Sequence, residues 1–330
     1  MIDFGLTFVS FFIGMVVGLT GMGGGALMTP VLVLFFNVPP LAAVSSDLVA
    51  SAVMKPFGTA VHLRRGTVHL GLVKWLCVGS IPSAFCGVLL IRAFGDGEQL
   101  QKVVKTSLGV VLVIAAAALI FKAYLALLDR ARRRAARRAS GGSADDTAPA
   151  ELRVRPLPTV IIGAIGGLVV GMTSVGSGSL IIISLILLYP TLKASQLVGT
   201  DLTQAVPLVM SAAISHLIFG DFQLEVTTSL LLGAIPGVLV GATMSSRAPG
   251  GIVRRALALV LLASGLKLLG ASNLVLGGIL LTVVLVGPPL WMLARRHHGM
   301  PILATQEKAA ALTPDPDEPA LDERPTGGRG

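Results

Sequence analysis

Apolar runs long enough to enter or cross a membrane recur along almost the whole chain. They cover approximately residues 4–20, 26–38, 42–62, 69–93, 101–128, 158–173, 179–190, 195–218, 226–245, 252–270 and 273–293. A helix needs about 20 predominantly apolar residues to cross a hydrocarbon core of about 30 Å. Only 13% of the residues are charged, whereas soluble domains carry roughly 25%. The sequence therefore predicts an all-α polytopic membrane protein.

Most of the chain consists of one unit used twice. "GLTGMGGGAL" (18–27) corresponds to "GMTSVGSGSL" (171–180), and "GSIPSAFCG" (79–87) corresponds to "GAIPGVLVG" (233–241). Matching registers in separate segments indicate a tandem duplication. The predicted divisions are a first repeat at 1–128, a basic linker at 129–156, a second repeat at 157–270, an extra transmembrane helix at 271–294 and a disordered tail at 295–330.

The distribution of arginine predicts how the chain is oriented. The net charge is +9, and the run "RARRRAARR" (130–138) follows an apolar segment. Such a run is typical of a cytoplasmic loop that contacts anionic lipid, so we do not expect a nucleic-acid partner. If each glycine-centred pair of segments is a hairpin, the linker and the C-terminal tail both lie in the cytoplasm. This hairpin arrangement makes the two halves antiparallel, in the plasma (inner) membrane.

Glycine is concentrated inside an apolar segment, where it would weaken a continuous membrane helix. Five of the eight residues from Gly18 to Gly25 are glycine. Broken helices between inverted repeats are typical of transporters, and glycine lets a ligand approach the backbone closely. Helices that begin just after the loops would also direct their positive ends toward an anion. We therefore expect the loops to bind substrate through Gly21, Gly23, Gly24, Gly25, Ser174, Gly176, Ser177 and Gly178.

Other glycines on the same helices fit close helix packing better. Gly14 and Gly18 are four residues apart, as are Gly167 and Gly171. Small residues at this spacing let two membrane helices approach each other closely. We assign these four glycines to packing rather than to binding.

The loops and their surroundings resemble the sulfite exporter TauE/SafE family over about residues 4–270. The resemblance includes both glycine loops, "SSDLVASAVMKPFGTAVHLRRGTV" (45–68), "GSIPSAFCG" and "VGTDLTQAVPLVMSAAISHLIFGDF" (198–222). It implies export or uptake of small anions such as sulfite, sulfonates and other organosulfur compounds. The second loop departs from the pattern, because serine replaces several glycine or apolar residues and no proline follows it.

Several polar residues inside the spans are further candidates. Lys55 lies in mid-span, where a charge costs about 2.5 kcal/mol or more, and we expect it to face the anion. Thr200 is a candidate hydrogen-bond donor to a polar substrate. Asp47 and Asp201 are either helix caps or first-turn acids, or they have a coupling role, in which they accept protons or pair with Lys55. His62 and His216 have either gating or proton-sensing roles, or they pack and form interfacial hydrogen bonds.

These features favour a secondary transporter, specifically an exporter, of a small organic or sulfur-containing anion. A proton or sodium gradient, or the gradient of the substrate itself, would drive it, because no ATP-binding P-loop sequence occurs. One alternative is an anion channel of the same architecture. Another is an intramembrane hydrolase with Ser177 or Ser179 as nucleophile and His216 as base. We expect no cofactor and no metal site, and we expect Cys77 and Cys86 to be buried free thiols.

Overall fold

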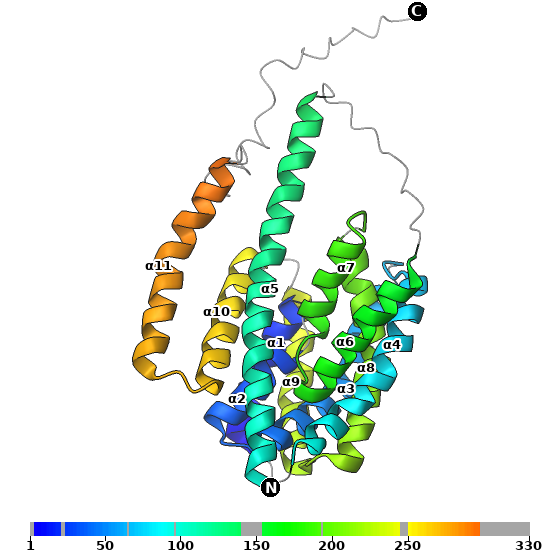
Figure 1. Ribbon diagram of the computed structural model, residues 1–330, viewed down its shortest axis with the longest axis vertical. Coiled ribbons are helices and arrows are strands. Elements are labelled where there is room, and N and C mark those ends of the chain that lie inside the picture. Colours follow the sequence, from blue (N-terminus) through cyan, green and yellow to red (C-terminus); the bar gives the residue numbers. More distant parts are fainter. Residues whose placement is uncertain are drawn as a thin grey trace, which may run out of the picture. The chain divides into compact units, whose positions relative to one another are not determined.

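The computed structural model describes residues 3–20, 24–64, 66–95, 97–139, 154–192, 194–244 and 250–297. All regular elements of this part of the chain are helical (Figure 1). The first repeat contains α1 (Phe4–Thr20), α2 (Gly25–Phe35), α3 (Pro40–Arg64), α4 (Leu70–Ala93) and α5 (Gly97–Ala139). The second contains α6 (Pro156–Thr173), the short π-helix η1 (Ser177–Ile181), α7 (Ile182–Leu188), α8 (Ala194–Phe219), α9 (Leu224–Met244) and α10 (Gly250–Leu268), and α11 (Asn273–His297) follows it.

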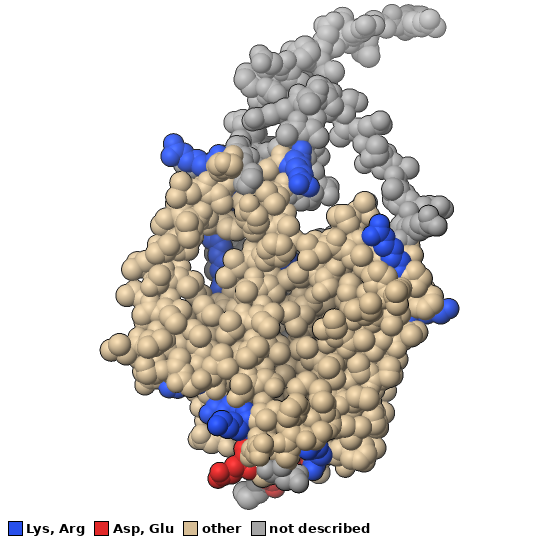
Figure 2. Space-filling model, viewed as in Figure 1, with Lys and Arg blue, Asp and Glu red and all other residues tan. Residues whose placement is uncertain are grey.

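The prediction of a polytopic membrane protein is confirmed. Six helical stretches of the described residues are long and apolar enough to cross a membrane, namely 70–93, 97–128, 156–173, 196–219, 224–241 and 273–297. Large apolar side chains point outward from both repeats, with exposed fractions of 66% at Phe8 and 63% at Ile165. The visible face of the molecule carries a broad region with few charged side chains (Figure 2). Such a surface suits contact with lipid.

Each repeat begins with a helical hairpin that returns to the side from which it enters. In the first hairpin, a Cβ placed on Gly5 would lie 3.9 Å from the ring of Phe36, so the start of α1 is next to the end of α2. In the second, the Tyr189 hydroxyl, just after α7, lies 2.7 Å from Thr159 Oγ1 in the first turn of α6. The α1–α2 pair and the α6–α7 pair therefore each turn back instead of continuing as one span, although α6 alone is long enough to cross a membrane.

The two repeats interlock through glycine contacts between α1 and α9. A Cβ on Gly233 would lie 2.0 Å from the Thr7 carbonyl oxygen, and a Cβ on Gly241 would lie 2.0 Å from that of Met15. The residue numbers rise together, so α1 and α9 run parallel. Gly14, predicted to pack, faces the backbone of α9 at Ala234 in the same way.

The equivalent contacts join α6 to α4. A Cβ on Gly167 would lie 2.4 Å from the Ser80 carbonyl oxygen, and a Cβ on Gly171 would lie 2.3 Å from that of Ala84. The packing role predicted for these two glycines is confirmed. Because α1 and α2 form a hairpin, α3 starts on the side where α1 starts, and α4 runs opposite to α1. Since α6 is parallel to α4, it is antiparallel to α1, and the repeats are inverted as predicted.

One predicted boundary differs from the structure. We expected a linker to begin at residue 129, but α5 continues through the arginine run to Ala139. Alanine and arginine are among the strongest helix formers, and this run consists almost entirely of them. Residues 1–125 and 145–280 form one compact unit, to which the contacts described above belong. Residues 126–144 and 281–330 are grouped in a second unit, whose described part consists of the helical ends of α5 and α11.

Candidate functional site

The two helix interruptions are the break before α2 and the break after α6. The start of α2 and the turn after α6 contact each other within the unit formed by residues 1–125 and 145–280. Gly25 begins α2, and Ser174 follows α6 in the left-handed conformation with φ of 58°. A Cβ on Gly25 would lie 2.0 Å from the Ser174 carbonyl oxygen, so only glycine fits this contact. Gly24 differs, because among the described residues the nearest atom to its added Cβ would be 3.9 Å away. Gly21 and Gly23 lie outside the described residues.

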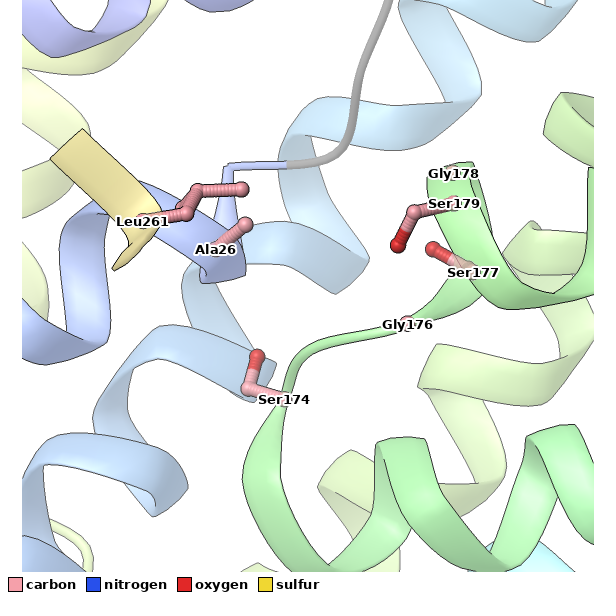
Figure 3. A pocket seen from close by; sticks show the side chains of 7 residues that line it. All are labelled: Ala26, Ser174, Gly176, Ser177, Gly178, Ser179 and Leu261. Carbon is pink, nitrogen blue, oxygen red and sulfur yellow. The ribbon is translucent and has the colours of Figure 1, made fainter. Parts of the chain in front are cut away.

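A small cavity lies where the interruptions meet (Figure 3). It is lined by Ala26, Ser174, Gly176, Ser177, Gly178, Ser179 and Leu261. The hydroxyls of Ser177 and Ser179 point into the space opposite Ala26 and Leu261 in this view. Gly176 has φ of 126°, which L side chains rarely adopt, and this turn directs the chain from Ser174 into η1. The second loop thus supplies most of the polar lining.

Lys55 of the first repeat reaches the loop of the second repeat. Its Nζ donates a hydrogen bond to Ser177 Oγ at 3.0 Å. Lys55 also interacts electrostatically with Asp201 and, more weakly, with Asp47. The structure therefore brings together the mid-span cation and a loop serine that the sequence singled out separately.

Asp47 and Asp201 are not helix caps, so that interpretation is wrong. The helix α3 begins at Pro40 and α8 begins at Ala194, which places both carboxylates inside their helices. Their exposed fractions are 0% and 2%. Proline at the first helical position is favourable because its missing N–H needs no partner there, and this start puts Asp47 well beyond the first turn.

The two aspartates have different partners although the repeat makes them equivalent. Asp47 Oδ2 accepts hydrogen bonds from Thr29 Oγ1 at 3.0 Å and from Ser174 Oγ at 2.6 Å. Its Oδ1 is buried with no hydrogen-bond partner among the described residues. Asp201 accepts from Gln204 Nε2 at 3.4 Å and is the carboxylate with which Lys55 interacts more strongly. Sequence reasoning missed Thr29, although a lone hydroxyl in an otherwise apolar helix was a signal.

His216 is buried and hydrogen-bonded through both ring nitrogens. Its Nε2 lies 2.7 Å from the Gly171 carbonyl oxygen, and its Nδ1 lies 2.8 Å from Ser45 Oγ. A carbonyl can only accept, so Nε2 carries the proton, and in the neutral ring Nδ1 accepts from the Ser45 hydroxyl. This geometry fits the packing interpretation. The pair of His216 with Ser177 or Ser179 that the hydrolase alternative requires is not formed, because both ring nitrogens are engaged by Ser45 and Gly171.

Two other predicted residues have different outcomes. The Thr200 hydroxyl oxygen accepts from the backbone N–H of His69, just before α4, at 3.0 Å. Its repeat counterpart Ser46 accepts from the N–H of Gln223, just before α9, at 3.4 Å. The Thr200 hydroxyl thus caps a helix of the other repeat. The side chain of His62, in α3, lies outside the described part of the structure.

Comparisons with known proteins agree with this architecture. The profile of the sulfite exporter TauE/SafE family matches residues 6–268. The Bacillus subtilis (strain 168) "Probable membrane transporter protein YjnA" is 39% identical over 264 residues, which are 78% of this chain and 96% of the relative. "Probable membrane transporter protein YdhB" from the same organism is 25% identical over 264 residues, 79% of this chain and 98% of the relative. No solved structure matches the chain. The apolar helices and the family match together define a multi-pass membrane transporter. This chain belongs to the sulfite exporter TauE/SafE family.

Proposed function

We propose that this transporter exports a small anion, such as sulfite, a sulfonate or another organosulfur or carboxylate anion, across the plasma membrane. The observation that carries the proposal is the Lys55 Nζ at 3.0 Å from Ser177 Oγ, beside a cavity lined by serine hydroxyls. A positive charge and hydroxyl donors can replace part of the hydration that an anion loses in the membrane. Because serine replaces glycine in the second loop, that loop adds donors to its backbone N–H groups.

The size of the cavity supports a carrier rather than an open channel. Its volume between the described residues is about 10 Å³, which is room for about one water molecule. An anion with several heavy atoms therefore needs the two interruptions to move apart. Inverted repeats supply two equivalent arrangements for such a movement, each opening the central site to one side of the membrane. We infer that the structure represents a closed conformation of this cycle.

A proteoliposome screen tests the proposal. Sulfite, a sulfonate, thiosulfate and small carboxylates are offered to the full-length protein, with and without a pH gradient. We expect one of these classes to enter with saturable kinetics and to show counterflow. Flux without saturation or counterflow would instead identify a channel, and no flux of any of these anions would overturn the proposed substrate class.

The orientation is proposed from the positive-inside rule. We expect the linker, with its arginines against anionic lipid, and the C-terminal tail to lie in the cytoplasm. Accordingly, Gly142→Cys should react with an impermeant thiol reagent only after the cells are opened, whereas Asp221→Cys should react in intact cells. Cys77 and Cys86 must first be replaced by alanine, because both are free thiols and, contrary to our expectation, neither is buried: Cys77 is partly exposed and Cys86 is exposed. Labelling of Gly142→Cys in intact cells would contradict the proposed orientation.

A further inference from the structure

The asymmetry between the two equivalent aspartates is the starting observation. Lys55 interacts with both carboxylates, more strongly with Asp201. On their shared helix, Asp47 and Lys55 are about 12 Å apart along the axis, and the ammonium group donates to Ser177 instead. Asp47 contacts two neutral hydroxyls and no cation among the described residues. Asp47 therefore receives less compensation from cations than Asp201, with which Lys55 and Lys122 both interact.

The individual oxygens of Asp47 define what is lacking. The two hydroxyl donors both point to Oδ2, which uses both lone pairs of that atom. The buried Oδ1 has no donor, and an ionised carboxylate oxygen buried without one is costly. A proton on Oδ1 removes the charge and leaves both existing hydrogen bonds to Oδ2 in place. A hard metal cation needs several oxygen ligands, and the described residues contain no cluster of three His, Cys, Asp or Glu suited to one.

Few other groups near Asp47 can titrate. The helices α2 and α6 contain no titratable residue. On α3 the relevant group is Lys55, and on α8 they are Asp201 and His216. Both ring nitrogens of His216 are already hydrogen-bonded, to Ser45 and to Gly171. The acid on α9 is Glu225, in the first turn of that helix. The donors to Asp47 come from neither charged nor titratable side chains.

We propose that Asp47, and not Asp201, binds the proton that is coupled to anion movement. Its two donors join it to both broken helices, through Thr29 on α2 and through Ser174 at the turn after α6. Loss of the proton makes both hydrogen bonds charge-assisted and therefore stronger, and its return weakens them. Binding of a proton to Asp47 thus changes how firmly the two helix interruptions are held together. The coupling rests on the proposed function, whereas the proton site does not.

Infrared spectroscopy of the full-length protein in lipid bilayers tests the site without any substrate. A protonated carboxylic acid has a C=O stretching band that a carboxylate lacks. As the pH is lowered from neutral we expect this band to grow in Asp201→Asn, and we expect the double variant Asp47→Asn/Asp201→Asn to lack it. We also expect Ser174→Ala to shift the band to higher frequency, because one hydrogen bond to the carbonyl oxygen is lost. This variant keeps the test decisive if the double variant does not fold.

Two spectroscopic results would overturn the site. One is a band that survives in Asp47→Asn/Asp201→Asn, and the other is a band that Ser174→Ala leaves unshifted in Asp201→Asn. The coupling is tested separately in proteoliposomes with sulfite as the probe, where uptake by Asp47→Asn should no longer respond to a pH gradient. An undiminished response would overturn the coupling. If the band behaves as expected but the wild type moves no sulfite, the proposed transport of sulfite fails while the proton site stands.

Discussion

Replacing Lys55 by methionine is expected to weaken the apparent affinity for the transported anion at least tenfold, which is about 1.4 kcal/mol. The physical reason is the position of its ammonium group, 3.0 Å from Ser177 Oγ at the edge of the cavity. Methionine keeps the length of the side chain and removes the charge. The measurement is the KM for saturable uptake of the anion found in the proteoliposome screen. Lys55→Arg keeps the charge and should retain part of the affinity.

The proximity of Asp201 requires a control for folding. Removing Lys55 takes away the stronger of the two lysine interactions with this buried carboxylate, leaving only the weaker one with Lys122, and a poorly compensated buried charge is destabilising. The double variant Lys55→Met/Asp201→Asn removes both charges and should restore the yield of folded protein. Its KM should stay raised, because the anion has still lost its cation. If the double variant recovers the wild-type KM, Lys55 compensates Asp201 and does not bind the anion.

The fold could be predicted because a membrane restricts which folds are available. Span length follows from the thickness of the hydrocarbon core, and the arginine distribution favoured hairpins over continuous helices. The glycine spacing of α6 also predicted its packing, since Gly167 and Gly171 both face the backbone of α4. These features are local or periodic in the sequence, so no knowledge of distant contacts was needed to read them.

The details of the site depend on contacts that sequence patterns do not contain. Ser174 donates to a carboxylate 127 positions away in the chain, and Lys55 donates to a serine 122 positions away. The repeat was even misleading here, because it predicted the same role for Asp47 and Asp201. The short polar segments just before the two aspartates suggested that the helices begin there. The helices α3 and α8 begin earlier, so Asp47 and Asp201 do not cap them.

The roles of the loop glycines could be distinguished only with the opposite loop in place. From the sequence, Gly24 and Gly25 were equivalent candidates. Among the described residues the added Cβ of Gly24 meets only the ends of the Met54 and Val17 side chains, at 3.9 and 4.0 Å, whereas that of Gly25 meets the backbone of the other repeat. A side-chain end can move aside, but the backbone at Ser174 is held by its neighbours. The two positions therefore form a matched pair for mutagenesis.

Gly25→Val is expected to abolish transport, whereas Gly24→Ala is expected to keep it. A Cβ at Gly25 would lie 2.0 Å from the Ser174 carbonyl oxygen and 2.7 Å from its Oγ, the atom that donates to Asp47. Overpacking of this kind costs about 1–3 kcal/mol, and relief requires the two interruptions to separate. That separation breaks the hydrogen bond between Ser174 and Asp47 and opens the cavity beside Lys55.

The measurement is uptake per amount of folded protein in proteoliposomes, with folded protein quantified by size-exclusion chromatography. Gly25→Ala adds only the Cβ and should already reduce uptake strongly, because the clash is with that atom. Gly24→Ala adds the same atom where there is room, so it controls for the loss of glycine in the loop. Equal activity of the two alanine variants would contradict the close contact of the interruptions, and the anion would then have to be bound without it.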